Sequence, residues 1–201
     1  MESMGRQEAK SERARKAIIE ATIKSLAKQG YSETSLVAVS RAAGYTKGAL
    51  QHHFVNREDL VAATLDELLS RTMRPYSELQ NGGKSRKSVV EGLMQAWERH
   101  VNTEAYQALL EILNASRVNS ALRSRISDDL VSWGAKMDAR SIETYESADG
   151  ANEDVAMLLN MNRCFMRGLL LQNLYGADKE ATRKYLDRWI KMIAPLLKYK
   201  E

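Results

Sequence analysis

The segment around Gly44 restricts the fold of this chain more than any other segment does. Gly44 follows a short stretch in which Leu36 and Val39 form an apolar side, at the position where a helix ends with a positive φ, and glycine adopts that φ at little cost. Thr46 can cap the next helix, in which Leu50 and Phe54 are four residues apart and share one face. The sequence therefore predicts two short helices joined by a sharp turn.

The polar residues of this helical pair remain on the outside. In a helix-turn-helix, the second helix enters the major groove of DNA, with its N-terminal residues at base edges and its N–H groups near phosphates. The absence of a side chain at Gly48 lets the backbone approach a surface. We expect the following residues to contact DNA: Thr34, Ser35, Arg41, Tyr45, Thr46, Lys47, Gly48, Gln51, His52 and Arg57.

The alternative to a DNA reader is a plain helical hairpin, in which Gly44 is an ordinary helix end and Lys47 a solvated charge. The charge of the segment favours DNA. From Arg6 to Arg57 there are ten basic and four acidic residues, a surplus of six, whereas the whole chain has a formal net charge of only +4. A local excess of this kind attracts a polyanion and favours specific binding over general coating of DNA.

These residues resemble the tetracycline-repressor-like (TetR) family of transcriptional regulators. The resemblance runs from about Ala14 to Leu65 and depends on these ordered features: Gly30-Tyr31, Thr34-Ser35, Ala42-Ala43-Gly44, Gly48, Leu50, His53-Phe54 and Asn56-Arg57-Glu58-Asp59-Leu60. The sequence departs from the family pattern at Gln51, where a Tyr is usual, and at Leu26, where a Phe is usual. Since Gln can pair with adenine through two hydrogen bonds, DNA binding is compatible with the first change.

Length, composition and turn signals predict an all-α fold of about nine helices. The 201 residues include 44% hydrophobic residues and only two prolines, so long stretches are free to be helical. We expect an N-terminal DNA-binding domain over 1–56 and a C-terminal helical bundle over 57–201, with a clear break at Asn81-Gly82-Gly83-Lys84-Ser85. Besides the two short helices on either side of Gly44, the predicted helices cover Ser11–Gln29, Asn56 (as cap) to Arg74, Ser88–Asn102, Glu104–Arg117, Ser120–Glu146, Asn152–Tyr175 and Lys179–Lys198.

The last two predicted helices are apolar on more than one side. One side can pack within its own chain, and the other requires a partner, although both can also be buried in a single chain. A glycine in the middle of the stripe suits close helix crossing. As the resemblance also implies, we expect a homodimer interface that contains Met157, Met161, Cys164, Gly168, Leu171, Tyr175, Trp189 and Ile193.

Large and polar side chains on the middle helices favour a cavity for a small molecule, although packing in a plain core accounts for the same spacing. The expected ligand-binding residues are Trp97, Tyr106, Asn114, Arg117, Trp133, Asn162 and Phe165. The sequence thus predicts a ligand-responsive regulator, and the resemblance implies a repressor that a small molecule releases from a near-palindromic DNA operator. A non-sensing or activating DNA-binding protein is the alternative, and a non-sensing one would lack a cavity in residues 84–175.

Enzyme, metal and membrane functions find no support in the sequence. His52 and His53 are adjacent, so they point about 100° apart on a helix and do not share a metal easily. Metalloprotease, phosphate-loop and nucleophile-elbow motifs are absent, and we expect no cofactor. With a single cysteine, no apolar run near ~20 residues and no apolar signal at the start, the chain is expected to be cytoplasmic.

Overall fold

The computed structural model describes residues 2–81, 88–150, 154–176 and 178–200. The chain forms two compact units, one from residues 1–70 and 104–130 and the other from residues 71–103 and 131–201. Helices α4 (Arg57–Asn81) and α7 (Ser120–Thr144) contribute residues to both units. The expected boundary at residue 56 does not coincide with this division, and the predicted turn at 81–85 lies largely outside the described residues.

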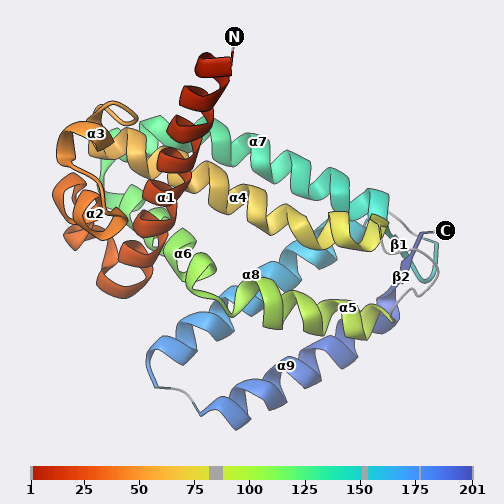
Figure 1. The fold of residues 1–201 in the computed structure, drawn as a ribbon. Coiled ribbons are helices and arrows are strands. Elements are labelled where there is room, and N and C mark those ends of the chain that lie inside the picture. The colour runs from red at the N-terminus through yellow and green to blue at the C-terminus, as the bar shows by residue number, and fades with distance from the viewer. Residues whose placement is uncertain (1, 82–87, 151–153, 177, 201) are drawn as a thin grey trace. The chain divides into compact units, whose positions relative to one another are not determined.

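The first unit contains α1 (Glu2–Glu33), α2 (Leu36–Ala43), α3 (Lys47–Gln51), the start of α4, α6 (Glu104–Val118) and the start of α7 (Figure 1). Helix α1 packs along α6 and α2, and it buries Ile18 and Leu26 completely. It begins earlier than the predicted Ser11. Helical geometry is interrupted at Gly30, where φ is 79° and ψ is 175°, so the predicted end at Gln29 is close to the observed one.

Helix α4 extends beyond its predicted end at Arg74. Asn56 caps it as expected, since its Oδ1 accepts a hydrogen bond of 2.8 Å from the Asp59 N–H. Pro75 then lies inside the helix, which continues to Asn81. Proline removes one helical hydrogen bond, but contacts on both sides keep this helix in place. Thr72 accepts a bond from Trp133 Nε1 at 2.8 Å, and Tyr76 shares one with Ser141 at 3.1 Å.

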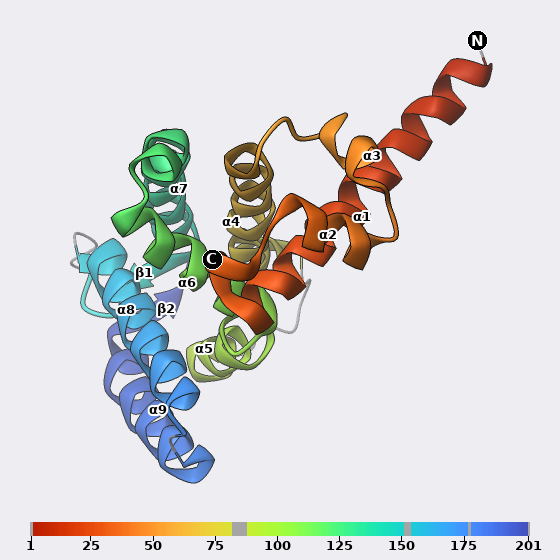
Figure 2. The same ribbon diagram turned by 90° about the vertical axis from the view of Figure 1, so that its left-hand side faces the viewer.

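The second unit contains the end of α4, α5 (Val89–Ala96), the π-helical turn η1 (Trp97–Val101), the end of α7, α8 (Val155–Leu174) and α9 (Lys179–Ile193). The single predicted helix over Ser88–Asn102 is therefore divided, and its last turn is wider than an α-helix, with the Asn102 N–H bonded to the Trp97 carbonyl at 2.8 Å. Helices α8 and α9 lie side by side (Figure 1 and Figure 2). The predicted start of α8 at Asn152 lies outside the described residues.

Two short strands close the second unit. Strand β1 (Tyr145–Ser147) pairs antiparallel with β2 (Leu197–Tyr199), and a 3₁₀ turn, η3 (Ala194–Leu196), precedes β2. The predictions that helices reach Glu146 and Lys198 are wrong. Pro195 lacks the N–H that would continue α9, and the residues after it bond to β1 instead.

Tyr145 and Tyr199 stack across the strand pair with ring centroids 4.9 Å apart. Burial raises the pKa of Tyr145 well above its ordinary value and raises the pKa of Tyr199. Gly92 of α5 leaves room for the second ring, because a Cβ at residue 92 would overlap Tyr199 Oη. The final strand is therefore anchored on both α7 and α5. Among the described residues there are nine α-helices and this one strand pair, so the predicted all-α fold is confirmed.

Candidate functional site

The sharp turn between α2 and α3 has the predicted geometry. Helix α2 ends at Gly44, whose φ is 74° and ψ 27°. The Gly44 N–H bonds to the Arg41 carbonyl at 3.2 Å and the Tyr45 N–H to the Ser40 carbonyl at 2.9 Å, a pair of bonds that terminates α2. Both helices have their side-chain caps: Ser35 Oγ accepts from Ala38 N–H at 3.2 Å, and Thr46 Oγ1 accepts from Ala49 N–H at 3.1 Å.

An apolar base fixes which face of α3 points outward. Val39 and Leu50 have no exposed surface, and Phe54 is also buried. The Arg15 guanidinium of α1 lies 5.7 Å from the centre of the Phe54 ring, a favourable cation–π contact. Since Leu50 points inward, its neighbours on the other side of α3 face the solvent.

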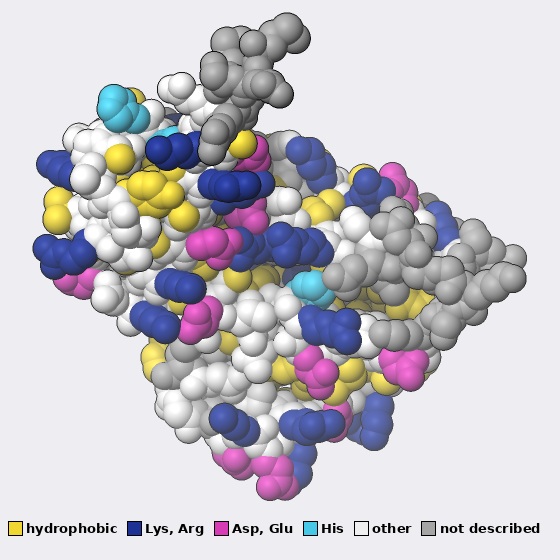
Figure 3. Space-filling view, in the orientation of Figure 1, with side chains coloured by type: hydrophobic (Ala, Val, Ile, Leu, Met, Phe, Trp, Pro, Cys, Tyr) yellow, Lys and Arg dark blue, Asp and Glu magenta, His cyan; other side chains and the backbone are white. Residues whose placement is uncertain are grey.

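Most residues predicted to contact DNA lie at the surface of α2, α3 and the turn between them. Tyr45 is half-buried, and the others in this set are exposed: Ser35, Arg41, Thr46, Lys47, Gly48, Gln51 and His52. Figure 3 shows Lys and Arg side chains over the part of the molecule formed by α1, α2 and α3. A Cβ at Gly48 would meet only Thr46 Oγ1, at 4.0 Å, so packing within the chain does not require glycine there.

Two predicted DNA contacts are corrected by the structure. Thr34 is only 1% exposed, and its hydroxyl donates to the Gly30 carbonyl at 2.9 Å and shares a 2.9 Å bond with Ser25 Oγ. Arg57 lies with its guanidinium 3.9 Å from the centre of the Tyr31 ring and donates to the Tyr31 carbonyl. Thr34 is inaccessible to DNA, and Arg57 is engaged inside the first unit.

The predicted ligand-binding residues separate into two groups. Tyr106, Asn114 and Arg117 belong to α6 in the first unit. Tyr106 is buried, but Asn114 and Arg117 are exposed, so the expectation that these two line an enclosed cavity is wrong. Asn114 and Arg117 lie away from the buried face of α6. The sequence alone did not determine which face of α6 is buried.

The other four predicted ligand-binding residues lie in the second unit. Trp97 is buried, and Trp133 is half-buried with its Nε1 bonded to Thr72. Asn162 Oδ1 accepts a bond of 3.0 Å from Trp189 Nε1, and Phe165 stacks on the Trp189 ring at 4.5 Å. Asn162 and Phe165 therefore hold α8 against α9.

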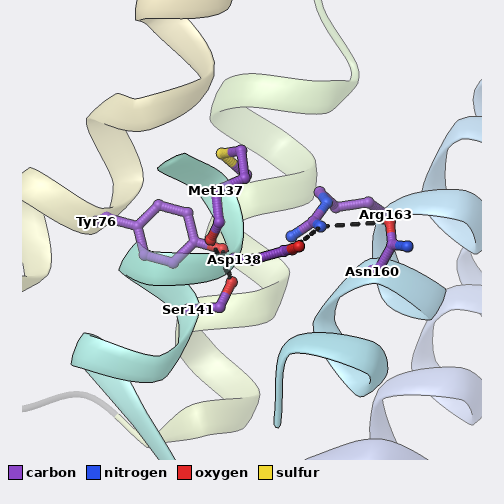
Figure 4. A network of polar contacts seen from close by, with 6 residues as sticks. All are labelled: Tyr76, Met137, Asp138, Ser141, Asn160 and Arg163. Atoms are coloured by element: carbon purple, nitrogen blue, oxygen red, sulfur yellow. Dashed lines mark hydrogen bonds and ion pairs between the residues drawn. The ribbon is translucent and has the colours of Figure 1, made fainter. Parts of the chain in front are cut away.

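A polar network in the second unit is not foreseen by the sequence motifs (Figure 4). Ser141 donates to the Met137 carbonyl at 2.8 Å and pairs with Tyr76. On α8, Arg163 Nη2 lies 3.3 Å from both Asp138 Oδ1 and Asn160 Oδ1. Tyr76 escapes prediction because Pro75 signals the end of a helix. A helix that continues through Pro75 places Tyr76 four residues after Thr72 on α4, and this spacing is the signal that could have found it.

The predicted dimer stripe on α8 is exposed along most of its length. Met157, Met161, Cys164 and Gly168 are exposed and Leu171 is half-buried, while Tyr175 is exposed just after α8 ends. On α9 and the turn that follows it, three more apolar side chains are exposed: Tyr185, Met192 and Leu196. We call these nine residues the α8–α9 surface. Trp189 is half-buried and bonded to Asn162. Ile193 is only 5% exposed, so the assignment of Ile193 to an external interface is corrected to a core role.

The described residues offer no membrane span and no metal centre. Helices long and apolar enough to cross a membrane are absent from the described part of the chain. Within the same residues, His, Cys, Asp and Glu side chains form no group of three or more that could hold a metal ion.

The comparisons with known proteins agree with this geometry. Residues 18–64 match the family described as "Bacterial regulatory proteins, tetR family". The regulator TtgR of Pseudomonas putida is 34% identical over 107 residues, which are 48% of this chain and 50% of TtgR, so the match spans half the length of that relative.

Solved structures extend the likeness to nearly the whole fold. A TetR-family transcriptional regulator from Rhodococcus is 22% identical with a TM-score of 0.66, covering 90% of this chain and 99% of that chain. A transcriptional regulator of Saccharomonospora viridis, solved in complex with choline, is 18% identical with a TM-score of 0.65, covering 90% and 96%. The family matched by residues 18–64 is one of regulatory proteins, which agrees with the prediction of a regulator rather than an enzyme. With its helix-turn-helix and its helical C-terminal part, the chain is similar to the TetR family of bacterial transcriptional regulators: residues 18–64 match the family, and nearly the whole chain shares the fold of a solved TetR-family regulator.

Proposed function

We propose that this regulator is a cytoplasmic homodimer that represses transcription and is released from its operator by a small molecule. The observation that carries the proposal is the outer face of α3, which presents exposed polar side chains. The Thr46 cap and the buried apolar residues beneath the helix hold this face in place. In this proposal, each subunit presents α3 to one major groove. The two half-sites of a near-palindrome then lie about one helical turn apart, roughly 34 Å.

Two kinds of contact are expected from the face of α3. Lys47 begins the helix and carries a charge suited to a phosphate or to a guanine edge, whereas Gln51, one turn later, suits an adenine edge. Phosphate contacts supply affinity that weakens with salt, and base contacts supply sequence preference. The two residues therefore predict different signatures in a binding titration.

Lys47→Ala tests the charge contact. If Lys47 meets a phosphate, operator affinity falls at low salt and the salt dependence decreases by about one unit of slope; a base contact instead costs about 1–3 kcal/mol. The measurement is a titration of operator DNA, selected from random duplexes, at several salt concentrations. Lys136→Ala on α7 removes the same charge from an exposed site in the second unit and should leave both quantities unchanged. An unaltered slope and affinity for Lys47→Ala would remove this side chain from the interface.

Gly48→Ala tests how closely the backbone of α3 approaches DNA. Because a Cβ there meets nothing closer than 4.0 Å within the chain, alanine should stabilise the fold by up to about 1 kcal/mol or leave it unchanged. Operator affinity should nevertheless fall, since the added methyl group occupies space assigned to the DNA backbone. Urea unfolding and operator titration measure the two effects separately. Equal or tighter operator binding by the alanine variant contradicts the close approach.

The α8–α9 surface supports the dimer part of the proposal. It consists largely of big apolar side chains exposed on two adjacent helices, and such patches on soluble proteins mark interaction sites. Gly168 lies within the stripe on α8, and no atom lies within 4 Å of the position that a Cβ would take, so its own chain gives no reason for glycine inside a helix. A second copy of α8 crossing closely at this point gives one.

Gly168→Glu should produce a folded monomer that no longer binds the operator. A carboxylate at the centre of the α8–α9 surface is desolvated by association but remains in water in the monomer. Sedimentation measures the mass, and urea unfolding verifies the fold. Gly134→Glu on α7, where a Cβ is equally unobstructed, is the matched control and should remain dimeric. A dimer of unchanged affinity for Gly168→Glu places the interface elsewhere.

The second unit supports the proposed response to a ligand. It combines buried aromatic side chains with the polar network of Tyr76, Ser141 and Arg163, a composition typical of sites that bind small molecules. The choline complex of the Saccharomonospora viridis regulator is an instance of ligand binding on the same fold. An effector acts by preferring the conformation that does not bind DNA, to the extent of its differential affinity.

A screen of metabolites, beginning with choline, tests the response. A tenfold loss of operator affinity requires only about 1.4 kcal/mol of coupling. Intrinsic fluorescence of Trp97 and Trp133 should change at the same ligand concentration that releases operator DNA. Trp133→Phe keeps an aromatic ring while removing the bond to Thr72, and should reduce the fluorescence change. Tight operator binding that no compound alters would instead favour the non-sensing alternative.

A further inference from the structure

Tyr31 occupies the junction between α1 and the helix-turn-helix. It follows Gly30, where helical geometry stops, and precedes Ser35, the cap of α2. Side chains from α6, from α4 and from the residue that caps α7 all contact Tyr31, and all of them belong to the first unit. Three later elements therefore converge on one residue of the reading head, by which we mean α1, α2 and α3.

Opposite charges bind the two backbone groups of Tyr31. Its N–H donates to Glu111 Oε2 of α6 at 3.2 Å, and its carbonyl oxygen accepts from the Arg57 guanidinium of α4. Both bonds involve a charged group, and bonds of this kind are stronger than neutral ones. Glycine suits the position before this bond, because the φ of +79° at Gly30 is unfavourable for other residues.

The side chain of Tyr31 is held as well. The Arg57 guanidinium lies 3.9 Å from the ring centre, and Asn119 Nδ2 donates to the phenol oxygen at 3.2 Å. Asn119 also caps α7, since its Oδ1 accepts from the Leu122 N–H at 3.0 Å. One asparagine therefore joins the beginning of α7 to the end of α1.

Two other polar links in the first unit are weak by comparison. Lys28 and Glu104 are 3.6 Å apart with both side chains more than half exposed, and Arg125 and Asp59 are 3.4 Å apart at a largely exposed site. Exposed ion pairs contribute little and do not fix geometry. Apolar packing holds α1 on α6, whereas the directional bonds to Tyr31 hold the point at which α1 leads into α2.

We propose that Glu111, Arg57 and Asn119 form a clamp on Tyr31 that fixes the orientation of the reading helices, with Glu111 as a positioning residue for operator recognition. The inference rests on the proposed DNA-binding function and assigns a role in operator recognition to α6 and the start of α7. A clamped reading head already has its binding orientation in the folded protein. A loose reading head must be ordered when it binds DNA, and this loss of entropy lowers its affinity for the operator. The two reading heads of a dimer must fit two half-sites at once. The clamp therefore also determines how much operator affinity falls when the spacing between the half-sites changes.

The test uses full-length protein and an operator selected by the unaltered protein from a random duplex library. Affinity is measured for this operator and for versions whose half-site spacing is changed by one or two base pairs. At the selected spacing, Glu111→Ala should bind the operator roughly tenfold more weakly than the unaltered protein, which is the scale of a lost bond to a charged group. At the altered spacings, the difference between the variant and the unaltered protein should be much smaller. Asn119→Ser keeps a helix cap but cannot reach the phenol oxygen, and should flatten the spacing preference less strongly.

Asn114→Ala, an exposed change on the same helix three residues from Glu111, is the matched control and should match the unaltered protein at every spacing. Urea unfolding verifies that each variant is folded under assay conditions. A loss of affinity that is equal at all spacings, or no loss at all, overturns the clamp. If Glu111→Ala does not fold, Asn119→Ser decides by the same criterion. If the unaltered protein selects no duplex, the DNA-binding proposal itself fails before any variant is compared.

Discussion

The outer face of α3, which we propose contacts DNA, depends on burying the inner side of a helix that is too short to be stable alone. Isolated helices below about 12–15 residues are marginal in water, and α3 has five residues. Its stability therefore comes from Leu50 and Phe54 in the apolar base and from the Thr46 cap. Complete burial of an apolar side chain stabilises by about 1.5–3 kcal/mol, which outweighs the propensity cost of Gly48. Because burial of the inner side of α3 stabilises the helix, the outer side can include Gly48, which has no side chain and lets the backbone approach DNA in the proposed complex.

Polar groups in the two units divide into those that satisfy their own helix and those that join elements. Thr22 and Thr64 are fully buried, and each hydroxyl donates to the carbonyl four residues earlier at 2.8 Å. Such bonds remove the cost of burying a hydroxyl and do not depend on neighbouring helices. The contacts of Tyr31 with Arg57, Glu111 and Asn119 differ, because these partners lie 26, 80 and 88 residues away in the sequence. Only the second kind can fix one element relative to another.

Local rules predict the turn, its caps and the exposed face of α3, because each is decided by residues within a few positions of one another. The errors arise where distant residues decide. Thr34 has a hydroxyl suited to capping or to DNA, but Ser25 and the Gly30 carbonyl bind it. Pro75 is a signal for the end of α4, yet contacts from α7 retain the helix beyond it. Ile193 belongs to an apolar stripe of α9 by spacing, and only the packing of the second unit places it inside.

The contacts within the α8–α9 pair bear on how two subunits would associate. Trp189 stacks on Phe165 and donates to Asn162, so the pair is already joined by aromatic and polar contacts inside one chain. A surface on preformed helices needs little further ordering on docking, so its apolar side chains can contribute most of their burial to affinity. In a twofold dimer, the same stripe meets itself, and a glycine at its centre then removes bulk from both sides of the crossing. Such symmetry would account for the exposure of Met157 and Gly168 on a helix whose other side is buried in the core.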